Sequence, residues 1–417
     1  MIQAVRGFKD LYGNEVRCWQ HIENIIKKSF SLWGFEEVRI PLLEKTELFQ
    51  RGIGDDTDIV EKEMYTFTDK GGEQVTLRPE GTASVIRFFN EHKLYGSEKF
   101  FKFFYLGPMF RYERPQKGRL RQFHQAGVEV LGEASPLAEL EVITLIMHLV
   151  EKIGIKNVEL KINSLGCNNC RRAFRENLVQ YYQAKQSGLC DDCKRRLQVN
   201  PLRLIDCKSE GCKSLASDAP LITGFLCDDC RQHFEALKKL LREHEIAFTE
   251  SPQIVRGLDY YNRTVFELHS YDLGAQSAVL AGGRYDTLSA NLGGVDIPAV
   301  GWAMGLERVV SVINNERLPE KENLVFVAFL GDAAEKEALS LIYTLRKAGI
   351  KADFDIFKGS LKSQFRKASK LSAKWVVIIG EEELKKGVFQ LKDMESGVQT
   401  AVTKTELISN LTQKKND

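Results

Sequence analysis

The sequence predicts an α/β protein with more than one domain. Apolar residues recur at helical spacing in some segments and form short strand-like runs in others, and 417 residues are too many for one hydrophobic core. With 43% apolar and 28% charged residues, the composition is that of an ordered globular protein. No stretch approaches the roughly 20 apolar residues that cross a bilayer. We therefore expect a cytoplasmic protein without a membrane partner.

The first domain begins with a helix and continues into a hairpin. Helical periodicity at 16–33 gives way to Gly34 and to a strand-like run at 35–41. Two β-type runs, at 100–106 and 122–131, flank a polar, arginine-rich loop. Runs of this kind predict a long antiparallel hairpin.

A cysteine-rich segment interrupts this domain. Residues 167–251 hold eight of the nine cysteines and many charges, which indicates an insertion. Strand signals resume after the segment, and a helix follows Gly305. We therefore assign residues 1–166 and 252–318 to one domain and residues 167–251 to an inserted one.

Residues 324–417 are predicted to form a separate α/β domain. The polar linker ERLPEKEN precedes alternating strand and helix patterns. This segment has 16 basic and 12 acidic residues, whereas the whole chain has a net charge of only +2. Lys362, Arg366 and Lys370 are spaced four apart on one predicted helix. They form either a stripe that faces phosphates or an ordinary solvated face.

Strict alternation would gather polar side chains on one face of the hairpin. The residues on this face are Gly107, Arg111 and Glu113 on the first strand, and Phe123, Gln125, Gly127 and Glu129 on the second. Such a face is costly inside a core unless it binds a ligand, although a solvated sheet face is an alternative. The loop between the strands carries Arg114, Lys117, Arg119 and Arg121, which suit phosphates or simply solvent.

Three other segments carry candidate ligand groups. In TLRPEGT, Glu80 and Thr82 could bind an ammonium group, or form a turn with an N-cap threonine. RGLDYY and AGGRYD place glycines beside Arg256, Tyr260, Tyr261 and Tyr285. Paired glycines let a ligand approach the backbone, but they also make ordinary hairpin bends. Arg308 lies near a predicted helix N-terminus, a natural site for an anion.

Eight cysteines occur as four closely spaced pairs. The pairs are Cys167 with Cys170, Cys190 with Cys193, Cys207 with Cys212, and Cys227 with Cys230. The first two pairs read C-x₂-C-x₁₉-C-x₂-C and the last two C-x₄-C-x₁₄-C-x₂-C, close to structural zinc spacing. Disulfides are disfavoured in a reducing cytosol. Structural zinc and metal-free thiols are the two remaining interpretations.

Taken together, these segments resemble the class II aminoacyl-tRNA synthetases and, within them, the histidyl enzymes. GFEEVRIPLLE resembles motif 1, FRYERPQKGRLRQFHQ motif 2 and VGWAMGLERVV motif 3, while RGLDYY and AGGRYD resemble the two histidine-specific segments. The resemblance covers nearly the whole chain. It implies an α+β catalytic core with an antiparallel sheet, a C-terminal mixed-sheet domain that binds the anticodon, and a homodimer. Phe8 departs from the family, which more often has Thr there.

The resemblance also implies an activity: histidine is activated with ATP and Mg²⁺ and transferred to the 3′ end of tRNA(His). Arg256 and Arg111 would act at the α-phosphate. The implied ATP-binding residues are Arg111, Glu113, Arg119, Phe123 and Arg308. The implied histidine-binding residues are Glu80, Thr82, Gln125, Glu129, Tyr260, Tyr261 and Tyr285. Gln116, Lys362, Arg366 and Lys370 would contact tRNA.

The alternative is a catalytically inactive, synthetase-like regulatory subunit of histidine biosynthesis. Such proteins lack the anticodon domain and have eroded motifs. This chain keeps Arg111, Arg256 and Arg308 together with a basic α/β tail, so we expect an active enzyme.

Overall fold

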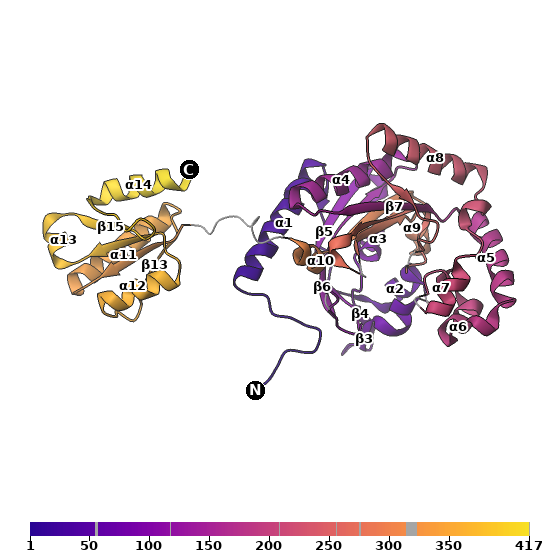
Figure 1. Ribbon diagram of the computed structural model, residues 1–417, viewed down its shortest axis with the longest axis horizontal. Coiled ribbons are helices and arrows are strands. Elements are labelled where there is room, and N and C mark those ends of the chain that lie inside the picture. Colours follow the sequence, from indigo (N-terminus) through magenta and orange to yellow (C-terminus); the bar gives the residue numbers. More distant parts are fainter. Residues whose placement is uncertain are drawn as a thin grey trace. The chain divides into compact units, whose positions relative to one another are not determined.

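The computed structural model describes residues 1–54, 57–116, 118–207, 209–255, 257–274, 277–313 and 323–416. Arg256 and Lys117, which the sequence analysis singles out, lie outside the described residues. The chain divides into two compact units, residues 1–318 and 319–417 (Figure 1). No helix in the described part of the chain is long and apolar enough to cross a membrane.

The first unit is built on an eight-stranded sheet in the order β1-β5-β6-β11-β10-β9-β7-β8. Its strands are β1 (Glu36–Glu37), β5 (Phe101–Phe110), β6 (Gln122–Leu131), β7 (Val158–Ser164), β8 (Thr249–Glu250), β9 (Asn262–Ser270), β10 (Ala278–Arg284) and β11 (Ala299–Gly305). Only the two end strands pair in parallel, β1 with β5 and β8 with β7. The predicted α+β core with an antiparallel sheet is confirmed.

Strands β5 and β6 form the predicted hairpin, and β5 extends to Phe110, beyond the predicted end at residue 106. The register pairs Phe103 with Glu129 and Gly107 with Gln125. Because directly paired residues project from the same side of a sheet, the alternation inferred from the sequence holds along β6. Arg111 continues the pairing beyond β5, since its backbone N–H donates to Arg121 O at 2.9 Å.

Three helices pack against one face of this sheet. The helices α1 (Asn14–Leu32), α4 (Leu137–Ile153) and α8 (Asp228–Glu243) bury their apolar sides against it. The shared core includes Phe30 and Trp302, and the Trp302 indole N–H donates to the Val142 carbonyl at 3.0 Å. On the opposite face, α2 (Thr46–Ile53), α3 (Thr82–Glu91) and α9 (Leu288–Asn291) cover only part of the sheet. A smaller three-stranded sheet of β2 (Leu43–Lys45), β4 (Gln74–Leu77) and β3 (Tyr65–Thr68) adjoins them.

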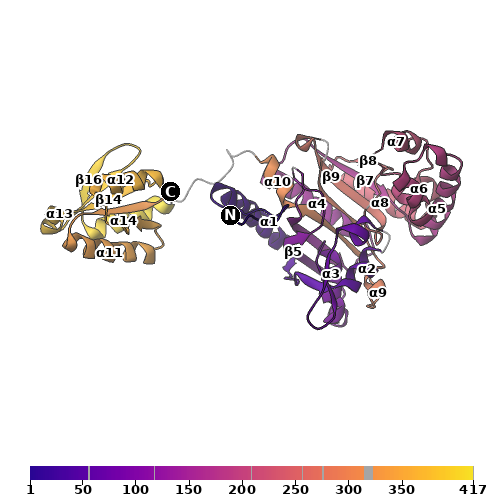
Figure 2. The same cartoon turned by 90° about the horizontal axis from the view of Figure 1, so that it is seen from below.

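The cysteine-rich segment forms a helical lobe with its own small core. Its helices are α5 (Asn168–Gln183), α6 (Asp191–Val199) and α7 (Glu210–Ala216). Phe174, Leu178 and Tyr182 pack at the centre of the lobe. Figures 1 and 2 both place the three helices together beyond the β7–β8 end of the sheet. The next helix, α8, instead packs its apolar residues onto α4.

The second unit is an α/β domain with a mixed sheet in the order β13-β12-β14-β15-β16. The strands are β12 (Val325–Phe329), β13 (Ala352–Phe354), β14 (Trp375–Ile379), β15 (Phe389–Asp393) and β16 (Gln399–Val402). The helices are α11 (Asp332–Lys347), α12 (Leu361–Lys370), α13 (Glu381–Lys386) and α14 (Lys404–Asn416). Helices α11 and α14 pack on one face and α12 on the other. The alternating strands and helices inferred from the sequence are all present.

Candidate active site

A cavity of about 320 Å³ lies on the sheet face that α1 and α4 leave open. The hairpin β5–β6, the start of α3, the segment before β9 and the start of α10 (Leu306–Val312) all contribute to its wall. Residues of the predicted site that line it are Glu80, Thr82, Arg111, Glu113, Arg119, Phe123, Gln125, Tyr260, Tyr261 and Arg308. The fold therefore brings segments that are far apart in the sequence to one place.

Glu80 caps the start of α3. Its two carboxylate oxygens accept hydrogen bonds from the backbone N–H groups of Thr82 at 2.7 Å and Ala83 at 2.8 Å. The first N–H groups of a helix have no partner within the helix, and an acidic side chain there also faces the positive end of the helix dipole. Burial raises the pKa of Glu80. The threonine N-cap considered from the sequence is wrong, because Glu80 supplies the cap.

Glu129 forms the floor beneath this helix start and is 0% exposed. The Thr82 hydroxyl donates to its Oε1 at 2.7 Å, and the Tyr285 hydroxyl donates to its Oε2. Burial raises the pKa of Glu129 to about 8, even though both hydrogen bonds favour the charged form. The side chain is therefore mostly protonated at neutral pH.

Three tyrosines enclose this floor. The ring centroids of Tyr260 and Tyr261 lie 4.6 Å apart, and the Tyr285 ring meets Tyr260 edge-on at 5.6 Å. Burial raises the pKa values of Tyr260 and Tyr285 well above the usual value, so both phenols stay neutral. Tyr285 reaches Glu129 from behind and does not line the cavity itself. The tyrosine rings therefore surround the buried carboxyl group of Glu129 with apolar surface.

Tyr105 is buried beside Glu80, Thr82 and Glu129, and the sequence did not single it out. A side chain at Gly81 or at Gly127 would place its Cβ 2.3 Å from the Tyr105 ring, so both glycines are needed to seat it. Burial, and then the charges of Glu129 and Glu80, raise the pKa of Tyr105. Alternation along the hairpin put Tyr105 on the same face as Gly107, and that signal could have found it.

Arginines gather at the other end of the cavity. The Arg111 Nε donates to the Pro79 carbonyl at 2.9 Å, and the Arg111 guanidinium lies 5.3 Å from the centroid of the Phe123 ring. Arg119 forms an ion pair with Glu113 at 2.9 Å. Burial, and then the positive charge of Arg119, lower the pKa of Arg308. An anion placed among these guanidinium groups would relieve their mutual repulsion.

Gln125 lies between the two ends. Its register partners are Gly107 on β5 and Gly305 on β11, neither of which has a side chain to cover it. Among the described residues, the buried Gln125 Oε1 has no hydrogen-bond partner. A buried carbonyl oxygen without a partner is costly in the empty protein and fits an N–H donor of a ligand.

The paired glycines of AGGRYD do not face the cavity. A Cβ at Gly282 would lie 2.3 Å from the Gly301 carbonyl oxygen, and one at Gly283 would lie 2.6 Å from the Thr264 carbonyl oxygen. A Cβ added at Gly301 would lie only 1.8 Å from Glu129 Oε2. Both the ligand approach and the hairpin bend considered from the sequence are therefore wrong: these glycines allow close packing within the sheet.

Comparison with known proteins places the chain in a family. Residues 7–309 match the family described as "Histidyl-tRNA synthetase", and residues 324–414 match that described as "Anticodon binding domain". The chain belongs to the histidyl-tRNA synthetase family. Relatives named "Histidine--tRNA ligase" include one from Geobacter sulfurreducens, 49% identical over 97% of this chain and 98% of its own length. Another, from Thermodesulfovibrio yellowstonii, is 48% identical over 98% of both chains.

A solved structure of the same family has the same fold. The apo histidyl-tRNA synthetase of S. aureus superposes with a TM-score of 0.83, is 34% identical, and is matched over 99% of this chain and 100% of its own. The predicted resemblance to class II histidyl enzymes is thereby confirmed. Full-length relatives named as ligases favour the enzyme over the regulatory-subunit alternative.

Other residues predicted for the histidyl-tRNA synthetase site lie outside the cavity. Gln116 lines a neighbouring cavity together with His124, whose ring lies 3.0 Å from the Glu307 carboxylate. Lys362, Arg366 and Lys370 are exposed on α12 in the second unit. Arg256 lies outside the described residues, while Leu258 and Tyr260, which follow it in sequence, line the cavity.

Proposed function

We propose that the protein activates histidine with ATP and then transfers it to tRNA(His). The observation that carries this proposal is a single cavity with Glu80, Thr82 and two tyrosines at one end and three arginines at the other. The buried Glu129 does not line the cavity itself but lies directly behind Thr82, whose hydroxyl it binds. In a chain of this family, the first end suits histidine and the second suits the phosphates of ATP.

Glu129 is proposed to bind the imidazole ring of histidine. Because its pKa is about 8, the carboxyl group can share its proton with a ring nitrogen at neutral pH. Glu80, Thr82 and Gln125 supply oxygen atoms for the ammonium group. A site that must hydrogen-bond its substrate rejects analogues without the matching groups far better than an apolar pocket does.

The arginines are proposed to stabilise the first reaction. A carboxylate oxygen of histidine attacks the α-phosphorus, a new P–O bond forms, and the bond to pyrophosphate breaks. Negative charge grows on the phosphoryl oxygens, so fixed guanidinium groups stabilise the transition state more than the ground state. We assign Arg111 and Arg256 to the α-phosphate, Arg308 to the γ-phosphate, and Phe123 to the adenine ring, with Glu113 and Arg119 beside it.

Mg²⁺ fits the arginine end of the cavity. Carboxylate oxygens are its preferred protein ligands, and Glu113 and Glu267 both lie near Arg308 there. When bound, the ion supplies positive charge to the phosphate oxygens. The zinc suggested by the cysteine pairs would be structural and outside this chemistry.

The second reaction transfers histidine to tRNA. A hydroxyl oxygen of the 3′-terminal ribose attacks the histidyl carbonyl carbon, and AMP leaves. Lys362, Arg366 and Lys370 offer exposed positive charge for the tRNA backbone, and Gln116 lies in the motif 2 loop. Both reactions are proposed to take place in the cytoplasm. We further propose that residues 1–166 and 252–318 form the catalytic domain, residues 167–251 the insertion, and residues 324–417 the anticodon-binding domain.

We also propose that the protein works as a homodimer. Leu42, Leu43 and Phe67 are more than two-fifths exposed in or next to the small sheet, and the first two belong to motif 1. Apolar side chains gathered on a surface often mark an interface between proteins. Light scattering of the purified chain would give the mass of two chains, and a monomer mass at micromolar concentration would contradict the dimer.

The test of the proposed activity is exchange of pyrophosphate into ATP, scanned across all amino acids. We expect exchange with histidine alone, and its loss by at least a hundredfold in Arg256→Ala, because removal of a charge that stabilises the transition state costs that much. Exchange with another amino acid would assign a different substrate. No exchange with any amino acid would overturn the proposal in favour of the regulatory subunit.

A further inference from the structure

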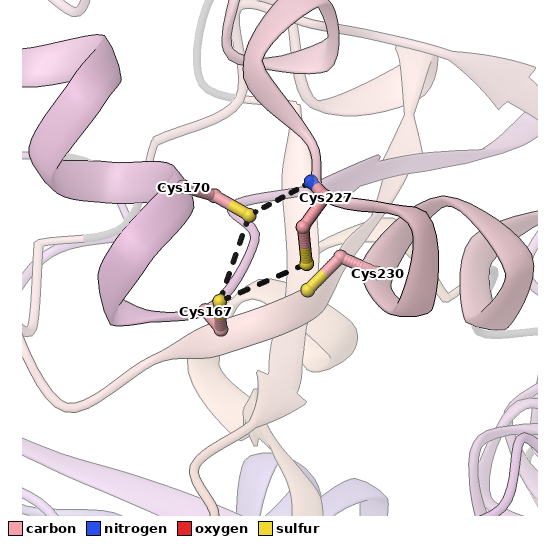
Figure 3. Close-up of side chains that lie close together, drawn as sticks. All are labelled: Cys167, Cys170, Cys227 and Cys230. Atoms are coloured by element: carbon pink, nitrogen blue, oxygen red, sulfur yellow. Dashed lines mark hydrogen bonds between the residues drawn. The ribbon is translucent and has the colours of Figure 1, made fainter.

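We propose that the eight paired cysteines form two separate four-thiolate zinc sites, and that one of them fastens the helical lobe to the catalytic domain. The junction cluster consists of Cys167, Cys170, Cys227 and Cys230 (Figure 3). The lobe cluster consists of Cys190, Cys193, Cys207 and Cys212. Within each cluster, all four sulfur atoms lie within 4.8 Å of one another.

This grouping settles which cysteine pairs lie together, which the sequence spacing left open. Along the chain, the pair after Cys167 and Cys170 is Cys190 with Cys193. In the fold, α5 runs away from the junction and the chain returns to it only at α8. The first pair therefore meets the last pair, and the two middle pairs meet inside the lobe. Spacing along the chain cannot distinguish these arrangements.

The distances between sulfur atoms match one tetrahedral ion. Cys167 Sγ lies 3.6 Å from Cys170 Sγ and 4.0 Å from Cys227 Sγ. In the lobe cluster, Cys190 Sγ and Cys207 Sγ are 3.8 Å apart. Zn–S bonds of about 2.3 Å give a tetrahedral edge of about 3.8 Å. A disulfide needs about 2.0 Å. A [2Fe–2S] or [4Fe–4S] cluster would divide the four sulfurs among two or four irons, so sulfurs on different irons would lie farther apart than around one ion.

The surroundings of the sulfurs also suit bound thiolates. The backbone N–H of Cys227 donates to Cys170 Sγ at 3.1 Å, and that of Cys190 donates to Cys212 Sγ at 3.3 Å. Cys167, Cys190 and Cys227 each occupy the N-cap of a helix, where the helix dipole favours negative charge. Such hydrogen bonds orient the sulfur ligands of a metal.

The buried apolar contact at the junction is small, and elsewhere the lobe is joined to the catalytic domain by polar contacts such as the ion pairs of Arg196 and Arg203 with Asp58. The buried apolar cluster at the junction consists of Cys170, Leu226 and Cys230, so two of its three members belong to the proposed metal site. The chain enters the lobe at Cys167 and leaves it at Cys227. A metal here links both ends of the lobe to the sheet, in the way that small cysteine-dense folds are held by zinc.

Hydrogen bonds of Arg171 connect the junction cluster to the segment that lines the cavity. Arg171 follows Cys170, and its backbone N–H donates to the Cys167 carbonyl at 3.0 Å. Its Nη1 donates to the backbone carbonyls of Asp259 at 3.4 Å and Tyr261 at 3.1 Å. Arg171 is therefore a positioning residue for the tyrosine segment, and this step rests on the proposed function of that segment.

The decisive experiment measures metal in the full-length protein purified without chelators. We expect one zinc ion per cluster, hence two per chain, by mass spectrometry of the metal. Cys167→Ser/Cys170→Ser and Cys190→Ser/Cys193→Ser should each lose one ion, while Cys18→Ser, at the unpaired cysteine of α1, should keep both. A zinc-free wild type, or visible absorption from iron, would overturn the proposal.

A second measurement uses only the wild-type protein, so it does not depend on the folding of the cysteine variants. Cobalt bound in place of zinc should give the intense sulfur-to-metal absorption of four-thiolate sites, at two equivalents per chain. A chelator should abolish this absorption and make the eight thiols reactive toward a thiol reagent. Thiols that already react fully without the chelator would contradict both sites.

The positioning step is tested by histidine binding. Arg171→Lys and the junction double variant should raise the KM for histidine in pyrophosphate exchange about tenfold and leave the KM for ATP unchanged. The lobe double variant is the matched control and should move neither. Equal effects of both double variants would contradict the route through Arg171. Failure of the proposed function would instead abolish exchange in the wild type, with the zinc content intact.

Discussion

Burial decides the chemistry of Glu129. A carboxyl group on the surface would be ionised at pH 7, yet desolvation raises the pKa of Glu129 to about 8. The sequence placed this residue on the polar face of the hairpin, and the family resemblance implied a contact with histidine. Its protonation depends on the 0% exposure that the fold imposes, and no pattern in the sequence measures that quantity.

The first prediction concerns the pH dependence of histidine binding. As pH rises through about 8, Glu129 of the wild-type protein without ligand loses its proton. A deprotonated Glu129 can no longer donate a hydrogen bond to the neutral imidazole ring of histidine, so the affinity for histidine should fall above that pH. Glu129→Leu should bind histidine about 10 to 100-fold more weakly at pH 7, because the buried ring nitrogen is left without a hydrogen-bond partner, and should lack this step. Calorimetric titrations between pH 6.5 and about 9 would test it. A step near pH 8 that persists in the variant would rule Glu129 out.

The second prediction concerns the glycines beneath Tyr105. Gly127→Ala should lower the free energy of unfolding by about 1–3 kcal/mol, because its Cβ would overlap the buried ring. Gly305→Ala on the adjacent strand is the matched control, since nothing lies within 4 Å of its Cβ. Urea denaturation of both variants measures the difference. Equal stability of the two variants would mean that the ring moves aside freely.

At the scale of elements, a buried ionic network joins α4, α8 and β10. Arg284 Nη2 donates to Glu139 Oε2 at 2.6 Å, and the His233 ring contacts the other oxygen of Glu139. Burial by itself would raise the pKa of Glu139, but the hydrogen bonds from His233 and Arg284 outweigh it and hold the pKa at about 2. Arg284, which precedes Tyr285 in AGGRYD, thus holds elements together and does not line the cavity.

The third prediction is acid instability through this network. The pKa of Glu139 is lower in the folded state than the roughly 4.3 of an unfolded chain, so its stabilisation is complete above about pH 5 and is lost as pH falls toward 2. Glu139→Gln should cost about 3–5 kcal/mol at pH 7 and show a flatter decline in acid. Urea titrations at several pH values test this, with the exposed Glu151→Gln of the same helix as control. A decline as steep in Glu139→Gln as in the wild type would assign acid unfolding to other groups.

At the scale of the whole molecule, we expect the first unit to carry out the chemistry and the second unit to bind tRNA. The cavity lies entirely in the first unit, and the exposed basic stripe of α12 lies in the second. Charge that neutralises a nucleic-acid backbone acts through salt-dependent binding. Chemistry on small substrates should therefore be independent of the stripe.

The fourth prediction tests this division. Replacing Lys362, Arg366 and Lys370 with Glu should raise the KM for tRNA at least tenfold and leave pyrophosphate exchange unchanged. Lys385→Glu/Lys386→Glu on α13 is a control with charges of the same sign on the same unit. Aminoacylation at two salt concentrations would measure both variants. An unchanged KM for tRNA in the triple variant would remove the stripe from the binding surface.

The sequence by itself determined the α/β class, the two-unit division near the polar linker, the β5–β6 hairpin and the family. Local spacing carries these features, because helix and strand periodicity and motif residues are written within short segments. The tertiary structure alone decided which cysteine pairs meet, that Glu80 caps α3, that Tyr105 lies between two glycines, and that Gly282 and Gly283 serve packing. Each of these depends on burial and on contacts between distant segments, which local spacing does not encode.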